Sequence, residues 1–361
     1  MKNGFWFKIL ITLALILSFL SPVVTDTEAA TTYSGFVKVS STSIKEKASS
    51  KSKTVGTLKK GSIVNVYAKT KSGWSEVYFK NKKAFVATKH LKITKKISFL
   101  LDKTKVYTYE DSEGATLSLK YSHAKSGWNV WKTRDGKVVV LTERETKAAL
   151  EEKEGNQALE RLSYPLYVGK KVTYKNETTR ITSLTKTVKT TAGTFKNCIE
   201  LQQLKSGDTS YYAPGVGLVL VKHGKTVELQ LAQKKTEKEI IVDEKEIEKL
   251  ITRNTKNSEL ENINAYMQDI TKSQRNNPAV VAKLKGIFNH YDLKYEIMDI
   301  KFLSMTNKEV IIEVKTKINA TYVEQGYEYR NNINTALHSI IKEDGKFVIQ
   351  QSGISDVEYI N

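Results

Sequence analysis

The sequence predicts a multidomain, mostly β protein with three parts: a small all-β barrel, a larger antiparallel β domain, and an α+β domain with a curved antiparallel sheet. Three observations lead to this prediction. Short runs of period-2 alternation separated by turn residues fill residues 31–96, and longer alternating runs fill residues 97–234. In residues 235–361, helical periodicity comes first and alternation follows. A chain of 361 residues has room for two or three domains.

The first thirty residues have the layout of a secretory signal peptide. Lys2 and Lys8 precede an apolar run over residues 9–20, and the segment ends on small residues at Ala29-Ala30. The apolar run is too short for a comfortable membrane span. We therefore predict export. The alternative, an uncleaved N-terminal anchor, also places the rest of the chain outside the cytoplasmic membrane.

Residues 54–92 show the clearest strand pattern. Their short apolar alternations are separated by Gly56, Gly61 and the pair Gly73-Trp74, where the chain is expected to turn. Short strands with turns between them indicate a small barrel. The apolar strand positions are Val64, Val66, Val77, Phe79, Phe85 and Val86.

This stretch resembles the bacterial SH3-like (SH3b) domain family over residues 33–93. The residues that match the family pattern are Val55, Gly56, Leu58, Gly61, Val64, Val66, Gly73, Trp74, Val77, Val86 and Leu91. The chain departs from the pattern at residues 44–50, IKEKASS in place of LNVRSGP, and at Ala84-Phe85-Val86 in place of a second G-W-V. The resemblance implies an SH3-like barrel in an exported bacterial protein that adheres to cell-wall polymers.

Positive charge is concentrated in the same region. Residues 31–97 hold 16 Lys and no Arg against only Glu46 and Glu76, a formal charge of +14, whereas residues 98–235 carry +8 and residues 236–361 carry −3. The screening length at physiological salt is about 8 Å, so lysines crowded onto a small barrel act together. Lysines near an anionic surface contribute on the order of 1 kcal/mol each. This density predicts salt-sensitive binding of an anionic cell-wall polymer, peptidoglycan or teichoic acid; a merely solvated lysine surface is the alternative.

Nucleic acid is not the expected partner, because lysine without arginine lacks the bidentate fork that reads bases, and an exported protein meets little DNA. Trp74 is predicted to be a stacking surface for sugar or, alternatively, a core residue of the barrel. The predicted electrostatic donors to the polymer are Lys45, Lys47, Lys51, Lys53, Lys59, Lys60, Lys82 and Lys83.

Residues 97–234 have the pattern of long antiparallel strands with one buried face. Alternation over residues 194–201 predicts that Phe195, Ile199 and Leu201 share one face. A charged, alanine-bearing stretch near residues 142–162 is predicted to be helical. Gly215 and Gly217 predict a bend rather than a phosphate loop, because no helix with a third glycine follows them.

Three segments of this region are together similar to a β-rich half-barrel domain of bacterial envelope proteins. They are YPLYVGKK (164–171), TVKTTAGTFKNCIEL (187–201) and YYAPGVGLV (211–219). The resemblance covers about 135 residues and implies a curved half-barrel sheet without naming a reaction. Distant relatives with such sheets carry lipids, so an apolar ligand groove is one hypothesis and an ordinary filled core is the other.

Cys198 is the only cysteine, so an intramolecular disulfide is excluded, and its distance from the signal segment argues against lipid modification. A cysteine nucleophile needs a paired base, and no histidine is near Cys198 in sequence, so we predict a structural thiol. No metal or cofactor is predicted, because none of the histidines shows ligand spacing. The histidines are His90, His123, His223, His290 and His338.

The last part of the chain begins with helices. Asp243 is predicted to cap the first helix, a second apolar set runs from Leu260 to Ile270, and Asn277-Pro278 is predicted to start a third helix. A turn at Asp344-Gly345 is predicted to join the last two strands. The predicted strands are Tyr295–Phe302, Glu309–Tyr322, Ile333–Lys342 and Lys346–Glu358.

This element order, with the closing pattern Lys346-Phe347-Val348-Ile349, resembles the cone-shaped nuclear transport factor 2-like superfamily, whose members include isomerases, dehydratases and non-catalytic pockets. A catalytic cone needs an acid or base projecting inside it. The candidates are Asp299, Tyr266, Tyr291 and His338. Each of these is more often a core or rim residue, so we predict that the protein is not an enzyme; a wall-targeted hydrolase or isomerase is the alternative.

The predicted organisation is therefore a signal peptide at 1–30, a bacterial SH3-like domain at 31–96, a β half-barrel domain at 97–234 and an α+β domain at 235–361. The predicted product is secreted and cell-wall associated. No stable membrane span is expected after signal cleavage.

Overall fold

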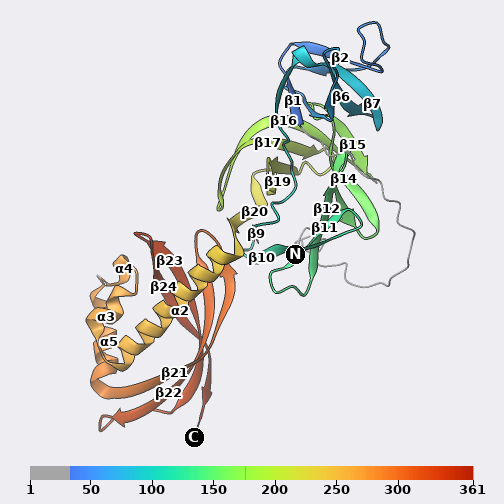
Figure 1. Ribbon diagram of the computed structural model, residues 1–361. Helices are drawn as coiled ribbons and strands as arrows, with labels where there is room; N and C mark the ends of the chain where they lie inside the picture. Colours follow the sequence, from blue (N-terminus) through green and yellow to red (C-terminus); the bar gives the residue numbers. More distant parts are fainter. Residues whose placement is uncertain (1–32, 175, 276, 361) are drawn as a thin grey trace. The chain divides into compact units, whose positions relative to one another are not determined.

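The computed structural model describes residues 33–174, 176–275 and 277–360 (Figure 1). The predicted signal peptide, residues 1–30, lies outside the described residues. The chain divides after Lys234 into two compact units. No helix among the described residues combines the length and the apolar character that crossing a membrane requires.

The first unit begins with a small barrel made of two antiparallel sheets, with strand orders β4-β1-β8 and β3-β2-β7-β6-β5. Its strands are β1 (Tyr33–Val37), β2 (Ser41–Lys45), β3 (Thr54–Lys59), β4 (Ile63–Val66), β5 (Ala68–Lys69), β6 (Trp74–Phe79), β7 (Lys82–Ala87) and β8 (Leu91–Lys95), with the 3₁₀ turn η1 (Thr88–His90) before β8. The core side chains are Val37, Ile44, Leu58, Val64, Val66, Val77, Ala84, Val86 and Leu91. The predicted small barrel is confirmed, and six of its core residues were already in the matched sequence pattern.

The rest of the first unit is one twelve-stranded antiparallel sheet of order β14-β13-β12-β11-β10-β9-β20-β19-β18-β17-β16-β15. The hydroxyl of Tyr174 in one edge strand donates to Oε1 of Gln157 in the other edge strand at 2.6 Å, so the sheet curls until it is nearly closed. The strands are β9 (Val106–Asp111), β10 (Thr116–Lys125), β11 (Trp128–Thr133), β12 (Val139–Glu145), β13 (Ala149–Glu154), β14 (Gln157–Ser163), β15 (Lys171–Tyr174), β16 (Glu177–Thr190), β17 (Gly193–Gln203), β18 (Thr209–Ala213), β19 (Gly217–His223) and β20 (Thr226–Lys235). The predicted β domain is confirmed, and its sheet curls further than half a barrel.

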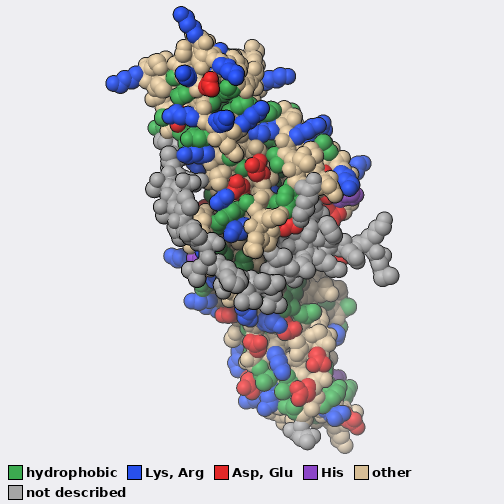
Figure 2. Space-filling model, turned by 90° about the vertical axis from the view of Figure 1, so that its right-hand side faces the viewer, with side chains coloured by type: hydrophobic (Ala, Val, Ile, Leu, Met, Phe, Trp, Pro, Cys, Tyr) green, Lys and Arg blue, Asp and Glu red, His purple; other side chains and the backbone are tan. Residues whose placement is uncertain are grey.

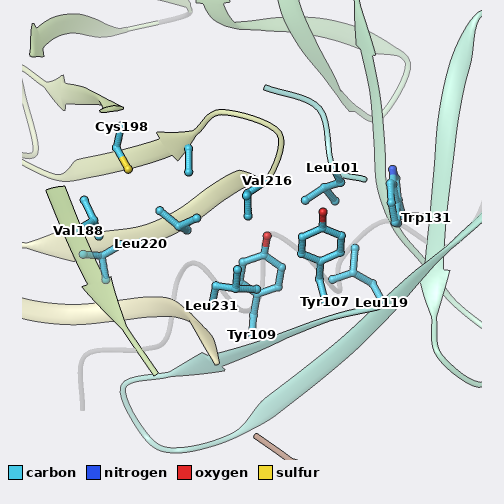
Figure 3. Close-up of a cluster of buried hydrophobic side chains, with 12 residues drawn as sticks. Leu101, Tyr107, Tyr109, Leu119, Trp131, Val188, Cys198, Val216, Leu220 and Leu231 are labelled. Atoms are coloured by element: carbon cyan, nitrogen blue, oxygen red, sulfur yellow. The ribbon is translucent and has the colours of Figure 1, made fainter. Parts of the chain in front are cut away.

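Buried side chains fill this sheet in two clusters. In one, Tyr107 meets Trp131 edge to face, with ring centroids 5.8 Å apart, and Figure 3 shows Leu101 and Leu119 beside them. The second cluster includes Leu150, Leu162, Ile181, Ile199 and Leu201. Aromatic side chains of this size contribute much of the apolar area that a curved sheet buries.

The helix predicted near residues 142–162 is wrong, because this stretch forms β12, β13 and β14. Its charged side chains pair across neighbouring strands rather than along a helix. Arg144 Nε lies 2.6 Å from Glu151 Oε2, and Arg161 Nε lies 2.7 Å from Glu152 Oε2. Ion pairs between neighbouring strands therefore stabilise the same charged residues that i,i+4 ion pairs would stabilise in a helix.

The predicted shared face of Phe195, Ile199 and Leu201 is also wrong. Asn197 has a left-handed φ of 57°, and the register of β17 against β16 shifts near it, so an extra residue breaks the alternation. Phe195 and Cys198 therefore pack into the first cluster, whereas Ile199 and Leu201 pack into the second. The predicted bend at Gly215 to Gly217 is confirmed, since these residues connect β18 to β19.

The barrel and the twelve-stranded sheet are joined by backbone pairing. Ile63 N donates to Leu166 O and Leu166 N donates to Ile63 O, both at 2.8 Å. Lys96 Nζ also lies 3.0 Å from Glu145 Oε2. Since Ile63 is buried among core residues of the larger sheet, the two parts share one apolar core at this junction.

The second unit is α+β, as predicted. The four strands form an antiparallel meander of order β21-β22-β23-β24, and α2 runs along the sheet with Ile240, Ile247, Leu250 and Ile251 buried (Figure 1). The elements are α2 (Glu237–Glu259), α3 (Ile263–Gln268), α4 (Lys272–Arg275), α5 (Pro278–His290), β21 (Tyr291–Met305), β22 (Val310–Val323), β23 (Asn332–Glu343) and β24 (Lys346–Tyr359).

The helix starts and turns of this unit follow local rules with one exception. Asn277 caps α5 and the Asp344-Gly345 turn joins β23 to β24, both as predicted. The predicted Asp243 cap is wrong, because α2 begins at Glu237 after the capping box of Thr236 and Glu239. Asp243 lies inside the helix instead, buried and bonded to Lys235 and Lys342.

The prediction that the apolar residues from Leu260 to Ile270 share a second helix is only partly confirmed. Met267 is buried in α3, but Leu260 is 62% exposed at the end of α2. Ile270 has left the helix and forms a parallel bridge to Ile349 of β24.

Candidate functional site

The strand register separates the predicted lysines into two groups at opposite ends of the five-stranded sheet of the barrel. Lys45 ends β2 and pairs with Thr54 of β3 and with Phe85 of β7, next to the β2–β3 loop and the β6–β7 turn. At the other end of β2, Ser41 pairs with Lys59. We name the first set the hairpin-end lysines, Lys45, Lys47, Lys51, Lys53, Lys82 and Lys83, and the second set the Trp74-end lysines, Lys59 and Lys60.

Two of the hairpin-end lysines are already engaged within the barrel. Lys45 Nζ donates to Ser52 O at 3.0 Å and to Thr54 Oγ1 at 2.9 Å, so this half-buried side chain braces the β2–β3 loop. Lys83 Nζ lies 2.6 Å from Glu76 Oε2, and this hydrogen bond raises the pKa of Lys83. Glu76 therefore offsets the charge of Lys83, whereas Lys45 keeps its charge but has two of its N–H donors occupied within the barrel.

The remaining lysines of both groups are exposed. Among the described residues, none of their ammonium groups is within salt-bridge distance of a carboxylate. These free cations are Lys47, Lys51, Lys53, Lys59, Lys60 and Lys82. The upper part of Figure 2 shows many basic side chains on the barrel surface and few acidic ones.

Trp74 begins β6 at the end of the sheet that carries Lys59, because its partner Ala87 is the last residue of β7. Ser75 and Val77 of the same strand are buried, and the alternation places Trp74 on the opposite face. Trp74 is half-buried and is not one of the barrel core side chains that the structure describes. Part of its surface is therefore accessible at the same end of the sheet as Lys59 and Lys60, with β2 and β7 between β3 and β6.

Sequence reasoning did not single out Lys80, which stands in the β6–β7 turn beside Lys82. Its Nζ lies 5.7 Å from the centre of the Phe79 ring. The charge count contained Lys80, but only the strand register shows which lysines stand next to one another.

The structure does not gather the four candidate catalytic residues of the second unit. Asp299 is exposed opposite Lys315, and His338 lies opposite Ile312 on the other face of the sheet. Tyr291 lies at the far end of the sheet opposite Val323.

The environments of the other candidates also differ from one another. Burial lowers the pKa of His338 to about 4, and its Nδ1 lies 2.8 Å from Ser352 Oγ. Tyr266 lies in α3, and burial raises its pKa. No acid–base pair is formed among these four residues.

Cys198 is fully buried, and burial raises the pKa of its thiol to about 11. This environment suits a structural thiol. Across the described ranges, no group of three or more His, Cys, Asp and Glu side chains is placed to hold a metal ion.

Two family models match parts of the chain. The bacterial SH3 domain matches residues 40–92, and the C-terminal domain of anti-sigma-I factor RsgI9 matches residues 249–360. The predicted bacterial SH3-like domain is thereby confirmed. The resemblance of the last part to the nuclear transport factor 2-like superfamily stays a prediction.

No curated protein matches the sequence. A solved structure, that of Bdellovibrio bacteriovorus Bd1075, is similar over 60% of this chain and 89% of its own, with 10% identity and a TM-score of 0.30. A TM-score this low carries no argument about fold or function.

Proposed function

We propose that this chain is a non-enzymatic, exported protein of the bacterial cell envelope, and that its SH3-like barrel holds anionic cell-wall polymer, peptidoglycan or teichoic acid. The observation that carries the proposal is the set of exposed lysines that have no carboxylate partner among the described residues, on a barrel of formal charge +14. The match of residues 40–92 to the bacterial SH3 domain supports the same setting.

The separation of the two lysine groups favours a long ligand. The five residues of β2 lie between the groups, and at about 3.3 Å per residue they span roughly 16 Å. This distance is about twice the screening length at physiological salt. The two groups therefore attract charge independently, and a polymer that reaches both gains from both, whereas a small anion gains from only one.

The two ends of the sheet carry different numbers of cations. The hairpin end holds most of the predicted lysines and suits a phosphate-rich polymer such as teichoic acid. At the other end, Lys59 of β3 and Trp74 of β6 are separated by β2 and β7. At about 4.8 Å between neighbouring strands this separation is roughly 14 Å, so only an extended ligand reaches both the ring and the two cations.

Retention on purified cell walls tests the proposal. Two double variants remove equal charge from the two ends, and a third removes it from the twelve-stranded sheet, where Lys189 and Lys196 are also exposed. The variants are Lys51→Gln with Lys53→Gln, Lys59→Gln with Lys60→Gln, and the control Lys189→Gln with Lys196→Gln. Retention is measured from 50 to 500 mM salt on walls with and without teichoic acid.

We expect each barrel variant to elute at lower salt than the parent chain, and the quadruple barrel variant to elute at the lowest salt. Each lysine near an anionic surface contributes on the order of 1 kcal/mol, so a double variant should weaken binding by about 10- to 30-fold at low salt. The control pair should elute with the parent. Equal elution of all variants would disprove the charge mechanism.

A second role is favoured by the match of residues 249–360 to the C-terminal domain of an anti-sigma-I factor. A chain of this kind would couple attachment at the wall to envelope signalling. Transcript profiling of a host strain that lacks the chain tests this role, and an unchanged set of sigma-factor-dependent transcripts would exclude it.

A further inference from the structure

The second unit contains a cavity of about 520 Å³, lined by α2, the α3–α4 segment and the β23–β24 turn. A volume of this size is within the range of small-molecule sites. The site forms because the parallel bridge between Ile270 and Ile349 holds the α3–α4 segment against β24. The segments that line the cavity are far apart in the sequence, so no sequence motif indicates it.

The lining is charged with both signs. Four basic side chains and three acidic ones surround the cavity, which leaves a formal charge of +1. Two ion pairs lie in the wall, Arg253 with Asp269 at 2.6 Å and Lys272 with Asp344 at 2.6 Å. The remaining charged side chains of the lining are Arg275, Lys346 and Glu343.

Two cations of the lining are left without a carboxylate within salt-bridge distance among the described residues. The guanidinium of Arg275 donates to the carbonyl oxygens of Ile270 and Gln268 and to the side-chain oxygen of Gln268, all of which are uncharged. Lys346 is exposed at the start of β24. Both cations line the cavity and can attract an anionic group of a ligand.

Asp269 is a residue of the lining that can attract a cationic group of a ligand, and it is only 3% exposed. Its Oδ1 accepts both hydrogen bonds from Arg253, and its buried Oδ2 has no hydrogen-bond partner among the described residues. A buried carboxylate oxygen without a donor is costly, so this position favours a ligand that brings an N–H group.

We propose that this cavity binds a small zwitterion of the α-amino acid or dipeptide class, with its carboxylate at Lys346 and Arg275 and its ammonium group at Asp269. The acidic residues of the lining disfavour a polyanion, and the basic residues disfavour a simple cation. Phe347 in the wall offers apolar surface to an aliphatic side chain. The inference is independent of polymer binding by the barrel.

Calorimetric titration of the full chain tests the proposal with four probes: dialanine, N-acetyl-dialanine, dialanine amide and inorganic phosphate. The second probe lacks the ammonium group and the third lacks the carboxylate. We expect dialanine to bind in the millimolar range or tighter, and each of the other three probes to bind at least about tenfold more weakly, because each loses a charge-assisted hydrogen bond.

Variants locate the binding in the cavity. Lys346→Gln removes an exposed ammonium group that has no salt-bridge partner among the described residues, and it should weaken dialanine binding about tenfold. Lys283→Gln makes the same change on the exposed side of α5 and should leave binding unchanged. The absence of dialanine binding at 10 mM, equal binding of phosphate, or equal binding by the Lys346 variant would each overturn the proposal.

Discussion

Glu143 makes the stability of the twelve-stranded sheet depend on pH. It lies in β12 and is only 2% exposed. Its Oε1 accepts from the backbone N–H of Leu101 at 3.1 Å and from Trp131 Nε1 at 3.0 Å. Burial, aided by the nearby charge of Glu152, nevertheless raises the pKa of Glu143 from 4.5 to about 8. The side chain is therefore protonated in the folded protein at neutral pH.

The sign of the effect follows from proton linkage. Between pH 4.5 and about 8 the folded chain holds a proton on Glu143 that the unfolded chain has lost, so stability falls as the pH rises through this window. The fall is about 1.4 kcal/mol per pH unit, or about 5 kcal/mol across the whole window, and it levels off above pH 8.

Glu143→Gln should remove this dependence. Glutamine retains an oxygen for Leu101 and Trp131 and does not ionise. The variant should therefore gain stability over the parent as the pH rises from 5 to 8, by about 1.4 kcal/mol per pH unit. Glu113→Gln, a change at an exposed carboxylate, is the control and should follow the parent at every pH.

The assay is urea unfolding followed by tryptophan fluorescence. The tryptophans that the structure describes, Trp74, Trp128 and Trp131, all lie in the first unit, so their signal reports on that unit. A difference between Glu143→Gln and the parent that stays constant from pH 5 to 9 would refute the reasoning.

Three further predictions concern packing and capping. Cys198 should react with a thiol reagent only after unfolding, because it is buried and its pKa is about 11; rapid labelling of the folded chain at pH 8 would contradict this. Gly56→Ala should cost about 1–3 kcal/mol of barrel stability in urea unfolding, since a Cβ would stand 2.7 Å from Phe79 Cζ, and an unchanged midpoint would exclude this contact. Thr236→Ala should cost about 1 kcal/mol through its lost bond with Glu239, seen as a lower melting temperature by circular dichroism at 222 nm, whereas Thr236→Ser should melt with the parent.

Local sequence rules predicted the elements whose causes are local. The Asp344-Gly345 turn and the Asn277-Pro278 helix start depend on neighbouring residues alone, and both hold. The barrel core followed from alternation, because Val64, Val77 and Val86 each pack inward in short strands. The four strands of the second unit were likewise found near their observed bounds.

The errors arose where distant residues decide the outcome. The charged stretch over 142–162 is strand because Arg144 and Arg161 find carboxylates on adjacent strands, which a helical reading of the same charges overlooks. The extra residue at Asn197 decides on which face of the sheet Cys198 lies, and an alternating sequence pattern does not reveal such a bulge. The cap at the start of α2 is the exception, because its cause is local: Thr236 and Glu239 carry the capping-box pattern in the sequence itself.

The same contrast between local and distant causes applies to the candidate site. Charge counting found the lysines, but the register of β2 against β3 and β7 was needed to sort them into two ends. The sequence alone does not predict the cavity of the second unit, because the bridge between Ile270 and Ile349 beside it joins residues 79 positions apart.

The paired backbone bonds between Ile63 and Leu166 have a mechanical consequence for a protein attached to a wall. If the barrel is the attachment point, as proposed, a pulling force on it reaches the twelve-stranded sheet through this pairing. The mechanical strength of the attachment then depends on the junction as well as on the lysines.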